Sequence, residues 1–322
     1  MKVRETTFKY REVLANKNIV FAVSGGPDSL AMLLATQYLG ARLKKKIVVA
    51  HFSHGLRPTE DEIERNLVRQ VAENCGVKFT YGNANVNPSE SAAREARYKY
   101  LAMVALEYDA IGILTAHTCD DQAETLLLRL VRGSGLKGVG SIREFSSRTI
   151  QGNKVLLLRP MLKITRAQTE AACLECDVLP ARDKSNDSLR YARNRIRSNV
   201  IPELEKINIQ AQAALVSFTD RASKDNEFLE DLAASKALEF ETRTPFKVEW
   251  DKRQLRELPE PLLIRVLENS WKHLTGEGST LGAQKIRQMI RVIQTSGYAH
   301  LGKKGHLANE RGEKIMMIVS VD

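Results

Sequence analysis

"AVSGGPDS", residues 22–29, lies where a short apolar run ends and a helical pattern begins. Two glycines, a proline, an acid and two serines at such a junction are typical of a loop that binds phosphate. The common P-loop is longer and closes with a lysine followed by Ser or Thr, and this stretch has neither feature. What the loop binds therefore depends on the fold and on the residues around it.

The first half of the chain alternates short apolar runs with longer segments of helical periodicity. We expect strands at 19–23, 47–50, 77–81, 111–115 and 155–158, with helices at 29–39, 61–74, 91–107 and 121–131 between them. This alternation predicts an α/β fold, a parallel sheet with helices on both faces. Ligands bind at the carboxyl ends of the strands in such folds. Four polar segments fall at these ends: 24–29, 51–57, 117–124 and Arg159.

The residues of the loop suit a bound pyrophosphate. Gly25 and Gly26 let backbone N–H groups approach an anion without an obstructing Cβ. Ser24 and Ser29 can donate hydroxyl hydrogen bonds, and the helix that follows adds the positive end of its dipole. Asp28 would repel a bare phosphate, so we predict that it acts through Mg²⁺. The alternative is a plain strand-to-helix turn in which serine and aspartate act as caps.

Three further segments accompany the loop: "HFSHGLRPTE" (51–60), "AHTCDDQAET" (116–125) and "DKSNDSLRYARNRIR" (183–197). Together the four motifs, over residues 17–200, resemble the N-type ATP pyrophosphatases and, within them, the bacterial tRNA(Ile)-lysidine synthetases. That family ligates lysine to the wobble cytidine of an isoleucine tRNA with a CAU anticodon. It adenylates the cytosine carbonyl at carbon 2, and the lysine amine then displaces AMP. The resemblance implies a Rossmann-like fold, ATP as cofactor, and tRNA and L-lysine as partners.

The resemblance also implies a nucleotide-binding set in the first two motifs: Ser24, Gly25, Gly26, Pro27, Asp28, Ser29 and His51. It places His117, in the third motif, beside ATP or the attacked base. His51 ends an apolar run, and its role can equally be to fix the loop that follows it. Asp28 is the one metal ligand that we expect, because Mg²⁺ prefers carboxylates and phosphates.

Asp121 and Glu124 lie three residues apart, hence on one face of a helix at its N-terminal end. Two such carboxylates can hold an ammonium ion and accept its proton when the amine attacks. We therefore expect them to bind lysine and, with Asp28 and His117, to form the catalytic set. An acidic first turn that complements the helix dipole is the alternative.

Basic residues gather in two segments. Arg94 and Arg97 lie one helical turn apart and should project together. The resemblance assigns one of them to nucleotide or anticodon contact. It also places four residues of the last motif in the substrate site: Asn186, Arg193, Asn194 and Arg197. An ordinary solvated basic face would explain either segment without a function.

Composition agrees with an intracellular enzyme that binds an anion. The 322 residues favour two domains, and no apolar run approaches the roughly 20 residues that span a bilayer. The charged start indicates no signal peptide, and four cysteines without a paired framework point to a reducing cytoplasm. The net charge of +10 favours an anionic partner, most commonly nucleic acid.

We expect the domain boundary near residue 208. Residues 1–208 would form the N-type ATP pyrophosphatase catalytic domain, and residues 209–322 a mainly helical tRNA-binding domain. In the second domain the patterns predict helices at 209–240, 262–274 and 283–293, with strands at 246–250 and 315–321.

Two other functions remain open. Cys173 and Cys176 form a single Cys-x-x-Cys, a pair that related tRNA thiolases use for iron–sulfur clusters or persulfide transfer. One pair cannot complete a four-cysteine site, and in a helix cysteine is commonly a small buried residue. A non-enzymatic RNA-binding protein is the second alternative, and it would leave Asp28 and its loop without a role.

Overall fold

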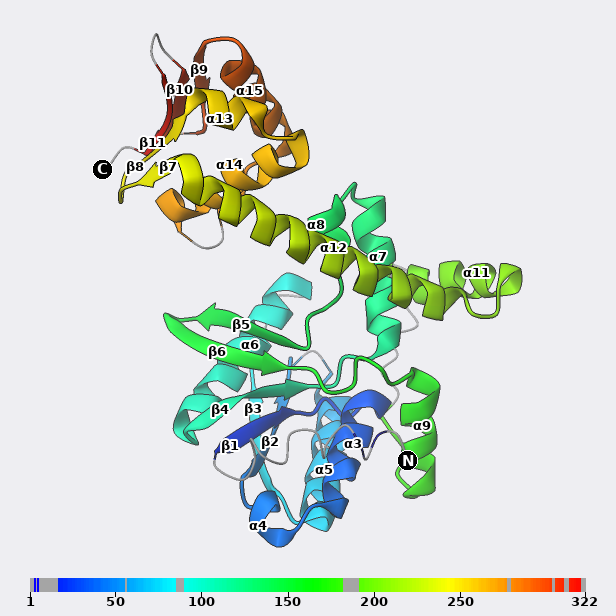
Figure 1. Cartoon of the computed structure of the whole chain (residues 1–322). Coiled ribbons are helices and arrows are strands. Elements are labelled where there is room, and N and C mark those ends of the chain that lie inside the picture. Colours follow the sequence, from blue (N-terminus) through cyan, green and yellow to red (C-terminus); the bar gives the residue numbers. More distant parts are fainter. Residues whose placement is uncertain are drawn as a thin grey trace. The chain divides into compact units, whose positions relative to one another are not determined.

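The computed structural model describes residues 3, 5, 17–55, 57–84, 90–181, 191–276, 279–302, 305–309 and 313–319 (Figure 1). The chain divides into two compact units, Met1–Ala222 and Ser223–Asp322, within the long helix α12 (Ala211–Phe240). Each unit has a hydrophobic core of its own. Within the described residues, no helix has the length and apolar character needed to cross a membrane.

The first unit is built on a six-stranded sheet in the described part of the chain. Its strands, in spatial order, are β3 (Lys78–Asn83), β2 (Ile47–Ser53), β1 (Asn18–Ala22), β4 (Ala110–Thr115), β6 (Asn153–Leu158) and β5 (Phe145–Ile150). Five of them are parallel, and β5 pairs antiparallel with β6 at one edge. The expected parallel sheet is confirmed, and the edge hairpin β5–β6 is an addition to it.

Helices cover both faces of this sheet. One face carries α3 (Pro27–Leu34), α5 (Pro58–Cys75) and α9 (Arg166–Glu175), and the other carries α6 (Glu90–Glu107) (Figure 1). Successive residues of a strand point to opposite faces, so Phe21 of β1 packs against the first set and Val20 against α6. Both faces of the strands are therefore apolar, which explains their continuous hydrophobic runs.

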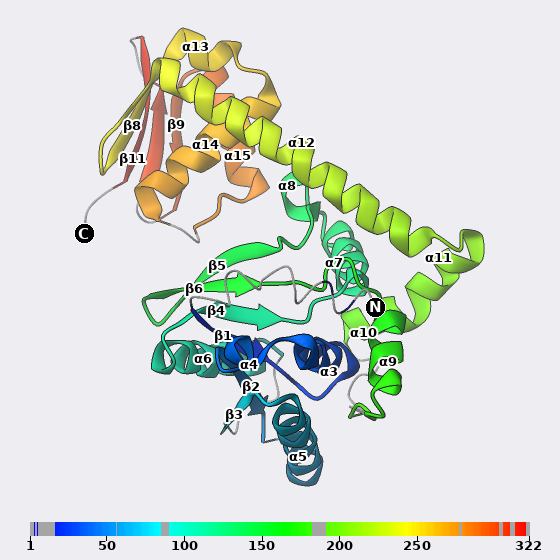
Figure 2. The same cartoon turned by 60° about the horizontal axis from the view of Figure 1, so that its bottom comes forward.

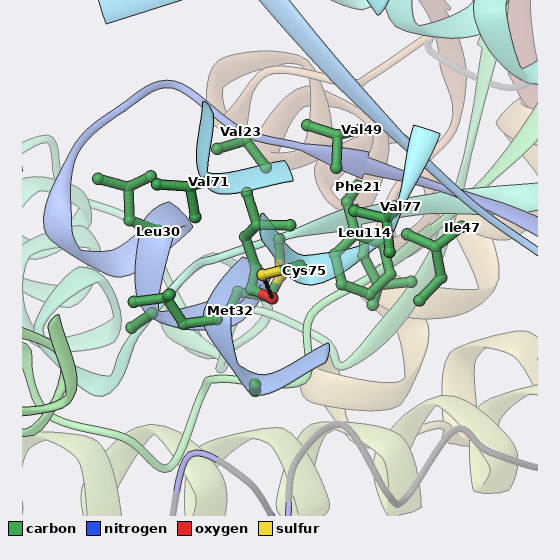
Figure 3. Packing of buried hydrophobic residues seen from close by; sticks show 14 of the residues in the cluster. Phe21, Val23, Leu30, Met32, Ile47, Val49, Val71, Cys75, Val77 and Leu114 are labelled. Carbon is green, nitrogen blue, oxygen red and sulfur yellow. Dashed lines mark hydrogen bonds between the residues drawn. The ribbon is translucent and has the colours of Figure 1, made fainter. Parts of the chain in front are cut away.

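The core under α3 and α5 is close-packed and holds a cysteine (Figure 3). Cys75 ends α5 fully buried, and its thiol donates to the backbone oxygen of Leu33 at 3.7 Å. Phe21, Val71 and Leu114 surround this pair. Packing of this kind anchors α3 on the sheet, and with it the loop that precedes the helix.

Further helices follow the carboxyl ends of β4 and β6. They are α7 (Cys119–Val131), α8 (Leu136–Val139), α10 (Ala192–Arg195) and α11 (Ile201–Ile207), and a π-helical turn (Ile196–Val200) links the last two. Figure 2 shows the arrowheads of β4 and β6 pointing toward α7, α9 and α10. Among the described residues, this unit also contains a 3₁₀ helix (Ala35–Tyr38) and α4 (Ala41–Lys44).

The second unit combines helices with a small antiparallel sheet. Its helices α13 (Lys252–Glu257), α14 (Glu260–Thr275) and α15 (Ala283–Gln294) cover a sheet of β7 (Glu241–Arg243), β8 (Lys247–Asp251), β11 (Lys314–Val319), β10 (Gly305–Asn309) and β9 (Gly297–His300), in that spatial order. Trp250 and Trp271 both lie in its core. The expected helices are present, and the sheet has more strands than the two that the sequence predicts.

Candidate active site

The glycine-rich loop joins β1 to α3 at the carboxyl edge of the sheet. Gly25 has a φ of +92°, a conformation that favours glycine, and Gly26 is the cap residue of α3. The hydroxyl of Ser29 accepts from the Ser24 backbone N–H at 3.1 Å and lies 3.0 Å from the Gly26 carbonyl oxygen, to which it donates. Ser29 therefore shapes the loop from inside, whereas Ser24 is exposed at its rim.

Asp28, in the first turn of α3, faces α9. Thr169 of α9 donates its hydroxyl to Oδ1 of Asp28 at 2.6 Å. Burial raises the pKa of Asp28, and the nearby charges of Asp121 and Asp120 raise it further, against the opposing effects of Thr169 and Arg166. A desolvated carboxylate beside two other acids favours a cation in its vicinity. In the described part of the chain, no three His, Cys, Asp or Glu side chains are grouped closely enough to hold a metal by themselves.

The helix α9 also fixes a second acid, Asp120 of α7. Oδ2 of Asp120 accepts the backbone N–H of Arg166, the first residue of α9, at 2.8 Å. α9 begins there because Thr165 and Gln168 form a capping box, in which each side chain bonds the backbone of the other. One helix start therefore positions acids from two different helices, Asp28 on α3 and Asp120 on α7.

Asp121 and Glu124 lie side by side on α7, as their spacing predicts, and both are bound by arginines. Arg193 donates its Nε to Glu124 Oε2 at 2.6 Å and its Nη2 to Asp121 Oδ1 at 2.7 Å. Arg197 donates its Nε to Glu124 Oε1 at 2.5 Å. Glu124 is 0% exposed. A carboxylate buried this deeply requires a permanent cationic partner, and here it has two.

The second oxygen of Asp121 has a different role. Oδ2 accepts the backbone N–H of Thr118 at 2.8 Å and completes the capping box that starts α7. The alternative, in which these acids only stabilise the start of the helix, therefore holds for one oxygen of Asp121. Its other oxygen belongs to the ion-paired cluster.

His117 lies two residues before the start of α7 and near a group of arginines. Its Nδ1 is 2.8 Å from the Thr115 hydroxyl. Burial lowers the pKa of His117 to about 3, and the charges of Arg159, Arg193, Arg94 and Arg97 contribute. The imidazole is neutral at physiological pH, so it can exchange hydrogen bonds with a ligand and adds no positive charge.

His51 is 1% exposed at the end of β2. Its Nδ1 donates to the carbonyl oxygen of Val23 at 2.8 Å, and its Nε2 lies 3.4 Å from the Ser53 hydroxyl. Val23 is the residue before the glycine-rich loop. His51 thus supports the loop from the neighbouring strand, next to the site in which we expect the nucleotide.

Arg94 and Arg97 of α6 project together over one aromatic ring. Their guanidinium carbons lie 5.1 Å and 5.6 Å from the ring centroid of Tyr98, and that of Arg148 from β5 lies at 4.6 Å. Asn194 is buried in α10 between Arg193 and the start of the π-helical turn. Asn186 falls outside the described residues.

Sequence reasoning missed Thr169, Tyr98 and Arg148, each of which contacts an expected site residue. Thr169 is held by Asp28 from 141 residues away, and no local pattern signals such a contact. Tyr98 lies next to Arg97 in the sequence, and a tyrosine between basic residues was the available signal. Arg148 lies on a strand that the apolar pattern did not reveal.

The cysteines do not form a reactive pair. All four are free, and burial raises the pKa of both Cys119 and Cys173 to about 12. The Cys173 thiol donates to the backbone oxygen of Pro27 at 3.5 Å, where α9 packs on α3. These thiols stay protonated at neutral pH, whereas sulfur chemistry requires the thiolate.

A loop of this kind between a central parallel strand and a helix defines a PP-loop nucleotide-binding domain. The profile of the PP-loop domain matches residues 2–204 of the chain. The solved structure of a U34-tRNA thiolase from Methanococcus maripaludis, with its 4Fe–4S cluster, aligns over 69% of this chain and 78% of its own. The TM-score is 0.56 and the identity 18%, a likeness of fold.

The curated relatives are more specific. The tRNA(Ile)-lysidine synthase of Nostoc sp. is 38% identical over 237 residues, which cover 72% of this chain and 68% of the relative. The enzyme of the same name from Synechococcus sp. is 32% identical over 86% of this chain and 84% of the relative. That of Dehalococcoides mccartyi is 31% identical over 87% of this chain, which spans 62% of its length. The chain belongs to the tRNA(Ile)-lysidine synthase family of PP-loop proteins.

Proposed function

We propose that the protein joins lysine to the wobble cytidine of the CAU-anticodon isoleucine tRNA, with ATP as the activating substrate. The curated relatives carry the name of this activity. The observation that carries the proposal is the meeting of the loop acid Asp28 with the acids of α7, beside two arginines. A site for pyrophosphate and a site for an amine then lie next to each other.

The loop would hold the phosphates of ATP. Ser24 and the backbone N–H groups of Gly25 and Gly26 would face the anion, and Pro27 starts α3, whose first turn would supply further N–H groups. Asp28 would hold Mg²⁺, because its buried carboxylate lies near two further acids and its described partner is a hydroxyl. When bound, the ion neutralises charge on the leaving pyrophosphate. Phosphate oxygens and water would complete its ligands.

In the first half-reaction, the cytosine carbonyl oxygen attacks the α-phosphorus of ATP and pyrophosphate leaves. His117 is neutral and lies among arginines. It would bind the nucleotide or the base by a hydrogen bond, while Arg193, one of these arginines, would face the negative charge that develops on the phosphate. Asn186, Asn194 and Arg197 complete the substrate site in this proposal.

In the second half-reaction, the lysine amine attacks carbon 2, the bond to the AMP oxygen breaks, and a proton passes to a carboxylate. We assign Asp121 and Glu124 to hold the ammonium group. Because Arg193 bridges these acids, lysine would replace one guanidinium there. The displaced Arg193 could then contact the phosphate of the adenylate, and Arg197 would keep Glu124 paired.

The two parts of the chain would divide the work. Residues 1–208 would carry the catalytic reaction, and residues 209–322 would bind the tRNA by its backbone. The net charge of +10 supports an anionic partner of this kind.

Incubation of the purified protein with ATP, labelled lysine and total tRNA tests the proposal. We expect label in the nucleic acid, dependent on ATP, and AMP and pyrophosphate in equal amounts. A parallel reaction with a labelled sulfur donor is the control for thiolation. Sulfur incorporation without lysine incorporation would overturn the proposed function.

A further inference from the structure

The edge hairpin β5–β6 brings two arginines to the face of the sheet that α6 covers. Arg148 of β5 pairs with Val155 of β6, whose side chain packs in the core under α6. Arg159 follows the end of β6, and its N–H donates to the Glu144 carbonyl at 2.9 Å, which continues the pairing. Side chains alternate along a strand, so Arg159 lies on the same face as Val155 and Leu157.

Arg94, Arg97, Arg148 and Arg159, here called the arginine cluster, gather around Tyr98. The ring of Tyr98 is 1% exposed and has three of the guanidinium groups within 4.6–5.6 Å of its centroid. Arg159 is 8% exposed, and its Nη1 donates to the Arg143 carbonyl at 2.7 Å and to Ser146 Oγ at 2.9 Å. The cluster is therefore held in place by an aromatic face and by the backbone.

The cluster has donors without acceptors. Nε of Arg159 and the hydroxyl of Tyr98 are buried and have no hydrogen-bond partner within the described residues. None of the four arginines has a carboxylate within ion-pair distance in the part of the chain that the structure describes. Burial lowers the pKa of Arg97 and of Arg159, and the charge of Arg94 lowers both further. Two desolvated guanidinium groups, Arg97 and Arg159, therefore lie near the exposed Arg94 and the half-buried Arg148, and an anion bound among them would offset their repulsion.

We propose that Tyr98, Arg148 and Arg159 complete a phosphate-binding site at the β5–β6 edge, distinct from the glycine-rich loop, which takes a backbone phosphate of the RNA substrate. Guanidinium groups match phosphate because two parallel N–H donors meet two oxygens. The inference rests on the proposed function for the identity of the RNA. The existence of the anion site does not depend on it.

Distance along the sheet favours RNA over ATP as the source of the phosphate. The loop follows β1, whereas Arg159 follows β6, two strands away, and Arg148 lies on β5, three strands away. Neighbouring strands are about 4.8 Å apart, so these arginines lie about 10–14 Å along the sheet from the loop. The cluster adjoins the substrate site at His117, whose pKa is lowered by burial and further by the charges of Arg159, Arg94 and Arg97.

Arg148→Ala tests the site, because Arg148 lies on an edge strand and is partly exposed. Lys154→Ala is the matched control, since it removes a cation from the exposed end of the same hairpin. The measurements are the affinity for unmodified tRNA between 50 and 300 mM salt (about this range, to resolve the salt slope), and the affinity for a non-hydrolysable ATP analogue without tRNA. Thermal unfolding of each variant verifies that it folds.

We expect Arg148→Ala to bind tRNA about tenfold more weakly, with a salt slope shallower by about 0.7–0.9, and to bind the ATP analogue unchanged. Arg148→Lys should keep the slope and recover part of the affinity, because it keeps the charge and loses the fork. Loss of ATP-analogue affinity with an unchanged tRNA slope would assign the phosphate to ATP and overturn the RNA source. If both affinities match those of Lys154→Ala, the anion site itself is wrong.

The proposed function fails separately. Wild-type protein that binds tRNA but transfers no lysine would overturn the ligation and leave the phosphate site standing. If the wild-type protein transfers lysine and the Arg148→Ala variant equals it in tRNA affinity and salt slope, the phosphate site is overturned and the ligation stands.

Discussion

The two halves of the carboxyl edge differ in how their charges are paired. Asp28, Asp120, Asp121 and Glu124, the acidic cluster, each accept a hydrogen bond from a hydroxyl, a backbone N–H or a guanidinium of the chain itself. Three arginines of the arginine cluster share one tyrosine ring, and the cluster leaves donors unused. Each half contains a buried charged group, Glu124 in one and Arg159 in the other, and the contrast between these two lies in their partners.

The contrast indicates what each half requires from a ligand. An acidic cluster that is already paired is held in a fixed geometry before substrate arrives, and a cation must exchange with a group that is present. An arginine cluster without a counter-charge gains stability from the ligand itself. We therefore expect substitutions among the acids to change the reaction steps, and substitutions among the arginines to change mainly the binding of anions.

Asp28→Ala should have the largest effect. Without its carboxylate the loop loses its expected Mg²⁺ ligand, and pyrophosphate release should fall at least about a thousandfold. The fold should survive, because the change removes a desolvated carboxylate whose pKa burial raises. Pyrophosphate release with ATP and tRNA is the measurement, and Asp231→Ala, an exposed acid in the second unit, is the control. Undiminished AMP transfer in Asp28→Ala would show that the loop does not work through this acid.

Glu124→Gln should separate the two half-reactions. If Glu124 holds the lysine ammonium, adenylation should continue while lysine transfer falls about a hundred- to a thousandfold, through a lost charge-assisted bond and a lost base. The readouts are pyrophosphate released and lysine transferred. Arg193→Ala is the informative companion, since Arg193 bridges both acids. If the two variants lose pyrophosphate release equally, the acids serve to position arginines and do not hold the amine.

The pH dependence of stability should reveal the environment of His117, whose pKa is lowered first by burial and then by the nearby arginines. Its pKa is about 3 in the folded state, against 6.5 for an unperturbed histidine, so between these pH values the unfolded chain binds more protons. Stability conferred by this group is present at neutral pH and is lost as pH falls below about 6.5. From pH 7 to 4.5 the loss should be about 2–3 kcal/mol. Between pH 7 and pH 4.5, the free energy of unfolding of His117→Gln should fall by about 2–3 kcal/mol less than that of the wild type. Urea unfolding at both pH values measures this. Equal losses in the two proteins would show that His117 does not titrate with a lowered pKa.

Replacing both Cys173 and Cys176 by serine should have the smallest effect. The Cys173 thiol packs between α9 and α3 as a neutral donor, and serine keeps a donor there. We expect lysine transfer to change less than about twofold and stability to fall by about 1 kcal/mol. Transfer assays and thermal unfolding measure the two. A folded double variant without activity would favour the thiolation alternative, with a reactive site at the cysteines that belongs to neither the acidic nor the arginine cluster.

The parallel strands could be predicted because the sheet is buried on both faces, which makes β1, β2 and β4 continuous apolar runs. β5 escaped prediction because an edge strand such as FSSRTI alternates exposed and half-buried residues. In the second unit β7, β9 and β10 are three to five residues long, too short for a period-2 pattern to stand out. Helices there were predictable from their amphipathic spacing.

The approximate place of the site was also predictable, because carboxyl ends of parallel strands meet at one edge. The pairing inside it was not. Arg193 and Glu124 are 69 residues apart, and the sequence places Arg193 in a general substrate site and Glu124 at the lysine amine, without pairing them. Only tertiary structure joins them in one ion-paired cluster. The same holds for Thr169 and Asp28, which meet because α9 packs on α3.

The two carboxylate oxygens of Asp121 accept from two different donors, and this limits how the position can evolve. Oδ2 starts α7 by accepting the Thr118 N–H, and Oδ1 accepts from Arg193. Asparagine would present an amide donor to one of these two donors, and glutamate would shift the carboxylate by a methylene away from the guanidinium. Neither asparagine nor glutamate, the two chemically nearest residues, can therefore replace Asp121 without loss. A requirement of the helix and a requirement of the site are inherited together in one side chain.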